Sequence, residues 1–279
     1  MPSLNDVTPD QAVATRDAAT IVLLRDTDEG PEVLLLRRHA RSGFAASLWV
    51  FPGGVVDRAD AHLDPAHWTG IDPESLTDRF DMPAETVLGM YVAGVRETFE
   101  EAGVLLAHHR DGRTPDTTTP AFTRMRAQMN DRAVDADWAG FLREHDLVLD
   151  LDALTYLSRW ITPIQEPRRY DTCFFVAHLP EGATASADNV ETTEERWIRP
   201  ADAIAADDVP MIFPTIRTLR DLQHAPTASA AVSAAATQPE VMVVQPHMEL
   251  DARGSFVRIL TASDADFPHE LYESDGPSS

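Results

Sequence analysis

Several features are scarce or absent in this sequence of 279 residues, and each absence excludes a class of protein. A single cysteine, Cys173, excludes an intrachain disulfide and fits a reducing compartment. No apolar run approaches the roughly 20 residues that a membrane-spanning helix needs. The N-terminus, MPSLNDVTPDQ, has neither the basic nor the apolar region of a secretory signal. We therefore expect a cytoplasmic protein.

Basic side chains are also few. The 23 arginine residues are outnumbered by 46 aspartate and glutamate residues, which gives a formal net charge of −23. Such a field repels nucleic acid and anionic membranes, so we expect neither as a partner, although the charge also fits a plain role in solubility. A polyanionic small molecule could bind only where metal ions and local arginines reverse the potential. Any phosphate chemistry must therefore depend strongly on metal.

Patterns typical of strands and helices alternate along the chain, of which 43% is hydrophobic. Apolar runs at 18–24 and 32–38 predict two buried strands joined by a turn. Further strands are expected at 47–51, 104–107, 156–162, 170–179 and 195–198, and helices at 83–103, 121–132, 136–144, 201–206 and 215–223. This alternation predicts an α/β layered domain with a mixed sheet.

Changes in composition suggest three parts. Residues 1–17 are expected to form a loose leader, 18–223 the folded domain and 224–279 a C-terminal extension. The domain carries two expected insertions, at about 58–82 and 108–150, and the first includes short helices anchored by Trp68 and Phe80.

The C-terminal extension has weaker patterns. The alanine-rich stretch 225–238 is either a linker or a weak helix. Residues 241–244 and 256–260 are apolar enough to pair as a terminal hairpin.

Three glutamates share one face of the helix predicted at 83–103, which we expect Asp81 to cap and Gly103 to end. At about 100° per residue, Glu97, Glu100 and Glu101 lie opposite an apolar stripe. The stripe consists of Leu88, Tyr91, Val95, Phe99 and Ala102. From spacing alone a solvated acidic face is the simpler explanation. Alternatively, Mg²⁺ or Mn²⁺ would relieve the repulsion between the carboxylates, with space beside Ala93 and Gly94 for a ligand to approach.

The sequence around these glutamates favours the metal site. RETFEEAGV at 96–104 matches the R-E-x-x-E-E-x-G half of the Nudix box at every fixed position, and PGGVVD at 52–57 resembles its glycine loop. The chain is thus similar to the Nudix hydrolase family. The resemblance implies the Nudix fold, an α/β/α sandwich with a mixed β-sheet. It also implies hydrolysis, with Mg²⁺ or Mn²⁺, of a nucleoside diphosphate linked to another moiety.

The box is interrupted, because Arg96 follows Gly54 by 42 steps (96 − 54) where the usual box has fourteen. A box split in this way resembles the nucleoside diphosphate-linked moiety X motif 19 branch. The similarity continues through WITP at 160–163, RRYDTCFF at 168–175 and WIRP at 197–200. That branch is associated with coenzyme A diphosphatase activity, which yields 3′,5′-ADP and 4′-phosphopantetheine or its acyl derivatives. Asp57 and Asp60 stand near the place of the first glutamate of the box, which leaves their part in metal binding open.

The resemblance assigns Glu97, Glu100 and Glu101 to the metal ion and Arg96 to the orientation of a carboxylate. The Gly53–Gly54 turn would bring backbone close to ligand or metal, or it is a plain tight turn.

Other polar residues are candidates for substrate contacts and for proton transfer. The general base is a glutamate of the box or one of Glu166, Asp188, Glu191 and Glu194. Two arginine pairs, Arg168–Arg169 and Arg37–Arg38, could bind phosphate through their guanidinium groups or pair with surface carboxylates; Arg41 is a further candidate. Trp160 and Trp197 could stack on adenine or belong to the core.

Three functions remain open. The leading one is hydrolysis of coenzyme A or acyl-coenzyme A. This small nucleotide substrate is the binding partner that the sequence suggests. The second keeps the metal site and takes ADP-ribose or a dinucleotide. The third is a non-catalytic Nudix-fold sensor, which would not need the full glutamate set. A homodimer is possible on this sequence.

Overall fold

The computed structural model describes residues 8, 11–41, 45–131, 133–251 and 255–272. Its main sheet is built from eight strands, which are β1 (Thr15–Thr27), β2 (Gly30–Arg38), β3 (Trp49–Val50), β4 (Gly53–Val55), β8 (Thr155–Ile161), β9 (Arg169–His178), β10 (Thr192–Ile198) and β11 (Met242–Val244). Six of these follow the order β10-β2-β1-β9-β8-β11, while β3 pairs with β2 and β4 with β1. The expected leader lies mostly outside the described residues.

The sheet is mixed, as the sequence predicts. Strand β1 runs parallel to β9 and antiparallel to β2 and β4. Helices lie on both faces, so the central strands are buried on both sides and their sequences are continuous apolar runs. This arrangement confirms the predicted α/β sandwich.

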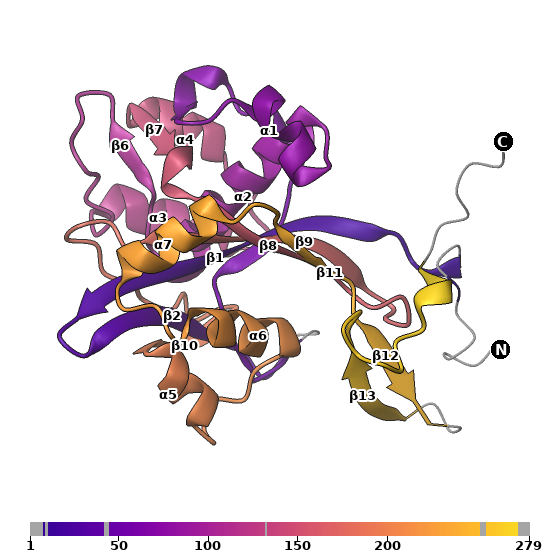
Figure 1. The fold of residues 1–279 in the computed structure, drawn as a ribbon. Coiled ribbons are helices and arrows are strands. Elements are labelled where there is room, and N and C mark those ends of the chain that lie inside the picture. Colours follow the sequence, from indigo (N-terminus) through magenta and orange to yellow (C-terminus); the bar gives the residue numbers. More distant parts are fainter. Residues whose placement is uncertain (1–7, 9–10, 42–44, 132, 252–254, 273–279) are drawn as a thin grey trace, which may run out of the picture.

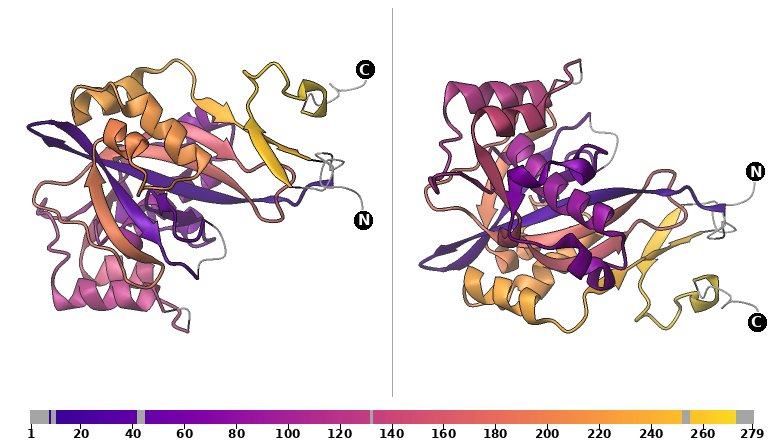
Figure 2. Two further views of the ribbon diagram at one scale, coloured as in Figure 1. Left: turned by 90° about the horizontal axis from the view of Figure 1, so that it is seen from below. Right: turned by 90° about the horizontal axis from the view of Figure 1, so that it is seen from above.

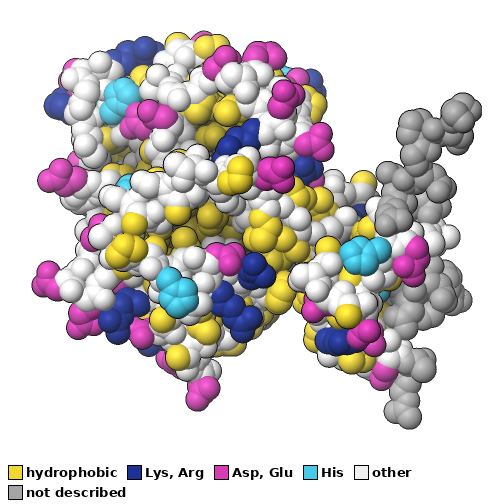
Figure 3. All heavy atoms as spheres, viewed as in Figure 1, with side chains coloured by type: hydrophobic (Ala, Val, Ile, Leu, Met, Phe, Trp, Pro, Cys, Tyr) yellow, Lys and Arg dark blue, Asp and Glu magenta, His cyan; other side chains and the backbone are white. Residues whose placement is uncertain are grey.

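Two hydrophobic cores flank the sheet, and their helices define the layers (Figures 1 and 2). One face carries α1 (Pro73–Phe80), α2 (Ala84–Ala102), α3 (Pro120–Met129) and α4 (Trp138–Glu144). The opposite face carries α5 (Pro200–Ala205), α6 (Phe213–Leu222) and α7 (Ala228–Thr237). On the face drawn in Figure 3, acidic side chains are spread around the outline rather than gathered in one patch.

The two expected insertions fold against α2. The first contains the 3-10 turns η3 (Asp60–His62) and η4 (Pro65–His67), strand β5 (Trp68–Thr69) and α1. Phe80 is fully buried and stacks on Tyr156 of β8, whereas Trp68 is half-buried at the edge of the core. The second contains α3, α4, and strands β6 (Ala107–His109) and β7 (Leu147–Asp150), which form a three-stranded sheet with β5.

Helix α2 occupies the predicted range and ends at Gly103. Gly103 adopts φ 71° and donates its backbone N–H to the carbonyl of Phe99. The expected cap at Asp81 is wrong, because Asp81 ends α1 in the left-handed conformation (φ 51°) and Pro83 precedes α2. The expected strand at 104–107 is displaced, since pairing begins only at Ala107.

The C-terminal segment differs from its expected form. Alanines of α7 are buried against the sheet, so this stretch is a packed helix. The proposed pairing of 241–244 with 256–260 is wrong. Strand β11 lies parallel to β8, while β13 (Phe256–Leu260) pairs with β12 (His247–Leu250) in a separate hairpin, followed by the turn η6 (His269–Leu271). Among the described helices, none is long and apolar enough to cross a membrane.

Candidate active site

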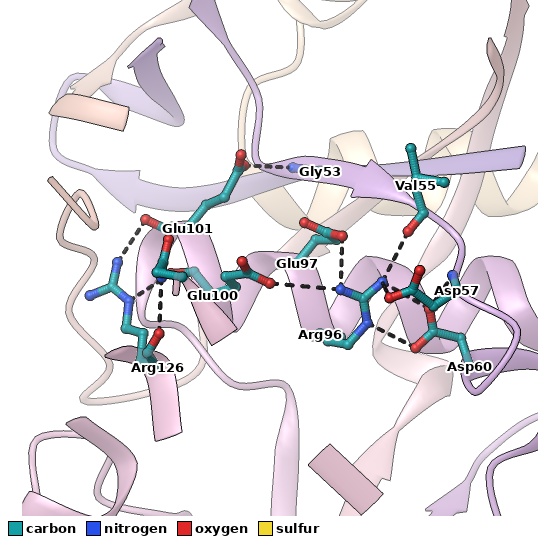
Figure 4. Close-up of polar contacts among 10 residues, drawn as sticks. Gly53, Val55, Asp57, Asp60, Arg96, Glu97, Glu100, Glu101 and Arg126 are labelled. Carbon is teal, nitrogen blue, oxygen red and sulfur yellow. Dashed lines mark hydrogen bonds and ion pairs between the residues drawn. The ribbon is translucent and has the colours of Figure 1, made fainter. Parts of the chain in front are cut away.

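Arg96 lies at the centre of a buried ionic cluster on α2 (Figure 4). Its Nε and Nη2 donate to Asp60 Oδ1 and Oδ2 at 2.9 and 2.8 Å, and Nη2 also donates to the carbonyl of Val55 at 3.0 Å. Its Nη1 donates to Glu97 Oε1 at 2.8 Å. Burial alone would lower the pKa of Arg96, but the bonds to Asp60 and the charges of Glu97, Asp60 and Asp57 raise it overall. Arg96 therefore stays charged and fixes the position of the Glu97 carboxylate.

The two aspartates near the box have different environments. Asp60 belongs to η3, and its side chain is 2% exposed and fully engaged by Arg96 and by the backbone N–H of Asp57. Asp57 is 69% exposed and lies 3.7 Å from Arg96. Asp60 is thus the buried partner of the arginine, and Asp57 faces solvent at the edge of the site.

The glycine loop is held directly against the glutamates. The N–H of Gly53 donates to Glu101 Oε2 at 2.9 Å, and Arg38 Nη1 lies 3.9 Å from Glu101 Oε1. A Cβ added at Gly54 would lie 2.5 Å from Glu97 Cδ, so only glycine leaves room for this carboxylate. Strand β4 brings the loop here by pairing Gly53 and Gly54 with β1.

Burial puts the three glutamates under electrostatic strain. Loss of solvent raises the pKa of Glu97, Glu100 and Glu101, and the neighbouring carboxylates raise the pKa values further. The pKa of Glu100 rises to about 8. Arg96 compensates only part of this effect. A cluster of buried oxygen ligands with unbalanced negative charge suits a hard divalent cation such as Mg²⁺ or Mn²⁺.

The side chains do not form a closed cage. Over the part of the chain that the structure describes, no three acidic, cysteine or histidine side chains are already spaced to surround a metal ion. An open set fits a cation such as Mg²⁺, which usually keeps water and substrate phosphate among its ligands.

The space expected beside Ala93 and Gly94 is absent, and that interpretation is wrong. A Cβ at Gly94 would lie 2.8 Å from Ile21 Cδ1, and Ala93 is fully buried. These small residues let α2 pack closely on β1. The insertions cover other parts of the helix, so it is enclosed on most of its surface.

An arginine that the sequence interpretation missed holds the C-terminal end of α2. Arg126 of α3 donates Nε to the carbonyl of Glu100 and Nη2 to that of Glu101, both at 2.7 Å. Its Nη1 and Nη2 also donate to Ser186 Oγ and to the Ser186 carbonyl, at 2.8 and 2.5 Å. A cation satisfies unpaired carbonyls and complements the dipole at a helix C-terminus. Arg126 thereby ties the second insertion and the β9–β10 loop to the two glutamates.

A cavity of about 1080 Å³ opens beside this cluster. Glu97, Glu100, Arg96 and the Gly53–Gly54 turn line it, whereas Glu101 lies behind the turn and does not. The only other basic residues among the described lining residues are Arg16 and Arg38. The Nε atom of Arg38 is buried and has no hydrogen-bond partner.

Of the other arginines considered for substrate binding, none lines the cavity. Arg169 donates to the carbonyls of Thr162 and Val13, and Arg37 pairs with Glu194 at 2.7 Å. Arg168 is absent from the lining, as is Arg41. Of the two arginine pairs, only Arg38 therefore lines the cavity, and the guanidinium groups of Arg37 and Arg169 bind other partners.

Two of the four extra carboxylate candidates reach the cavity. Glu166 and Glu191 line it. Asp188 accepts the backbone N–H groups of the following loop, from residues 190–192, and so stabilises that turn. Glu194 is the partner of Arg37.

The two tryptophans also separate. Trp160 lines the cavity, packs edge-on against Phe213 and donates Nε1–H to Ser158 Oγ. Trp197 lies against the first core with the Arg25 guanidinium 4.4 Å above its ring. Cys173, a free thiol, is buried.

Comparison with known proteins links this geometry to one family. The model of the NUDT19 Nudix domain matches residues 72–208, which include α2 with its glutamates but not the glycine loop. The chain is 33% identical over 211 residues to the acyl-coenzyme A diphosphatase NUDT19 of Gallus gallus, covering 62% of this chain and 55% of that protein. The Homo sapiens protein of the same name is 32% identical over 207 residues, covering 63% and 55%. The chain thus spans about half the length of these relatives.

A solved structure supports the same conclusion for the fold. The NUDIX hydrolase of Alicyclobacillus acidocaldarius superposes with a TM-score of 0.67 at 27% identity, covering 81% of this chain and 99% of that one.

Proposed function

The chain belongs to the Nudix hydrolase superfamily, in its NUDT19 branch, and we propose on that premise that it hydrolyses the diphosphate linkage of coenzyme A or acyl-coenzyme A. The products would be 3′,5′-ADP and 4′-phosphopantetheine or its acyl derivative. The observation that carries the proposal is the buried glutamate cluster of α2, which opens onto a cavity large enough for a nucleotide derivative.

The residues of the cluster would have different roles in hydrolysis. Glu97, Glu100 and Glu101 would hold Mg²⁺ or Mn²⁺, and Arg96 would keep Glu97 oriented through its 2.8 Å contact. The cation, when bound, neutralises phosphate oxygens and activates the attacking water. Gly54 leaves room for the Glu97 carboxylate, because a side chain at Gly54 would occupy its space.

Arg38 is the basic residue best placed to contact a phosphate. Its side chain is directed into the glutamate cluster, and its buried Nε lacks a partner. In a chain with net charge −23, such a group and the bound cation would reverse the local potential and admit a polyanion. Glu166 and Glu191 are the proposed alternatives for the general base, since both line the cavity.

The substrate assignment draws on the relatives. Both are named acyl-coenzyme A diphosphatases, and the matches cover 62% and 63% of this chain and 55% of each relative. We also propose the cytoplasm as the location, because the single cysteine is buried and no disulfide is needed.

Product analysis tests the proposal. The protein is incubated with Mg²⁺ or Mn²⁺ and, separately, with coenzyme A, an acyl-coenzyme A, ADP-ribose and a dinucleotide. Release of 3′,5′-ADP from the first two is expected. Release of AMP from ADP-ribose alone would contradict the substrate assignment, and tight binding without turnover of any compound would indicate a sensor.

A further inference from the structure

The cavity beside the glutamates has two chemically different ends. One end is charged and contains Glu97, Glu100, Arg96 and Arg38. A second group of lining residues, here called the apolar end, is apolar and comes from distant parts of the chain, namely Trp160, Met211, Phe213, Pro246, Met248 and Ile259. The charged residues Arg16 and Glu166 also line the cavity. A volume of about 1080 Å³ is slightly above the usual range for small-molecule pockets. The cavity therefore extends beyond the residues that would hold a diphosphate.

The C-terminal hairpin contributes only apolar residues to this lining. Met248 of β12 and Ile259 of β13 face the cavity, together with Pro246, which precedes the hairpin. The charged residues of the same strands do not line it, because Glu249 and Arg258 pair with each other at 2.5 Å. The hairpin therefore presents an apolar surface to the cavity.

The hairpin contacts the body of the domain through a hydrogen bond and is braced by residues that follow it in the chain. Gln165, in the β8–β9 loop beside Glu166, lies 3.0 Å from His247 of β12. His247 in turn lies 3.0 Å from the hydroxyl of Tyr272, whose ring stacks on the buried Phe267. Figure 1 shows the hairpin continuing from β11 at the end of the main sheet. The hairpin is thus held beside the β8–β9 loop, whose Glu166 also lines the cavity.

We propose that this apolar end binds the acyl chain of an acyl-coenzyme A and that Met248 and Ile259 determine the preference for acylated over free coenzyme A. The inference rests on the proposed function, since the charged end must hold the diphosphate. Each methylene of a hydrocarbon chain that leaves water makes binding more favourable, whereas the free thiol of coenzyme A has no such chain to bury. The continuity of the two ends within one cavity lets a single substrate occupy both.

Substitutions in the hairpin separate this role from a merely structural one. Met248→Asn and Ile259→Asn place a polar group in the apolar wall, and Val257→Asn makes the same kind of change on β13 at a side chain that is 52% exposed and does not line the cavity. The value of kcat/KM is measured for octanoyl-coenzyme A and for coenzyme A. We expect the ratio of the two values to fall on the order of tenfold in Met248→Asn and Ile259→Asn, mainly through KM, and to stay unchanged in Val257→Asn.

A filling substitution tests the same proposal without adding a polar group. Met248→Trp reduces the space at the apolar end, so the preference should move from octanoyl towards acetyl-coenzyme A. Binding of octanoyl-4′-phosphopantetheine, measured by calorimetry in EDTA, should weaken in parallel in all the cavity variants.

The outcomes distinguish the inference from the proposed function. If the wild-type protein hydrolyses none of these compounds, the proposed function fails. If it hydrolyses both, but the cavity variants lower both kcat/KM values equally or leave the ratio and the chain-length preference unchanged, the acyl site is refuted and the diphosphatase assignment stands.

Discussion

The pairing of Arg96 with Asp60 provides a quantitative test of the site. In Asp60→Asn, an amide NH₂ group replaces one of the carboxylate oxygens that accept from Arg96. Its N–H groups then face the N–H groups of the Arg96 guanidinium, a residue that is only 8% exposed. Removal of one partner from a buried ion pair costs about 3–5 kcal/mol. Because Glu97 and the Val55 carbonyl still accept from Arg96, we expect a loss near the lower bound, about 3 kcal/mol.

The matched control is Asp57→Asn. The Asp57 side chain is 69% exposed and lies 3.7 Å from the same guanidinium, so its contribution should be about 1 kcal/mol or less. Thermal unfolding of the metal-free protein measures both changes. A loss of about 3 kcal/mol corresponds to a fall in Tm of roughly 6–12 °C at this chain size, against a few degrees or less for the control.

Activity provides a second measurement on the same variants. Asp60 acts through Arg96 on the orientation of Glu97, and loss of such a supporting contact typically costs about 10–100-fold in metal affinity or activity. We expect this loss in Asp60→Asn, with a higher Mg²⁺ requirement, and little change in Asp57→Asn. Equal stability and equal activity of the two variants would refute the assigned role of Asp60.

Other features of the site lead to further predictions. Arg126→Ala should lower Tm and kcat, because it removes the hydrogen bonds to the carbonyls of Glu100 and Glu101. Arg126→Lys should restore more stability than activity, since one ammonium group cannot reproduce the forked contacts of a guanidinium. Equal values for the two variants in unfolding and rate assays would count against this role. Gly54→Ala should abolish hydrolysis, because its Cβ would lie 2.5 Å from the Glu97 carboxyl carbon, and circular dichroism should show that the fold is retained. An active variant would show that this close approach is unimportant. Burial raises the pKa of Cys173 to about 12, so its thiol should not react with a disulfide reagent at pH 8 until urea unfolds the protein, and rapid labelling of the native state would contradict its burial.

The features that the sequence predicted correctly depend on local patterns. Helix α2 is defined by the 3.6-residue period and by Gly103, which must adopt a positive φ at its C-terminus. The central strands are apolar runs because helices cover both of their faces. These signals lie within a few residues of each other and need no knowledge of the tertiary fold.

The features that the sequence did not predict depend on contacts between distant segments. A helical wheel assumes one buried side, but the insertions and the sheet together enclose α2, so the glutamates lie in a buried cluster. The partners Asp60 and Arg126 come from those insertions and have no fixed spacing from the box. Arg169 looked suitable for phosphate, yet two backbone carbonyls take its guanidinium. The three-residue strand β11 is too short to indicate its partner.

The most direct test of the metal-dependent diphosphatase is the rate of coenzyme A hydrolysis at saturating Mg²⁺ in Glu101→Gln. The control is Glu85→Gln, which makes the same change on the same helix at a side chain that is 68% exposed. We predict that Glu101→Gln folds, retains the Gly53 contact through its amide oxygen and loses turnover, while Glu85→Gln matches the wild-type rate. Hydrolysis at the wild-type rate by Glu101→Gln would contradict the assignment of the buried glutamates to the metal ion.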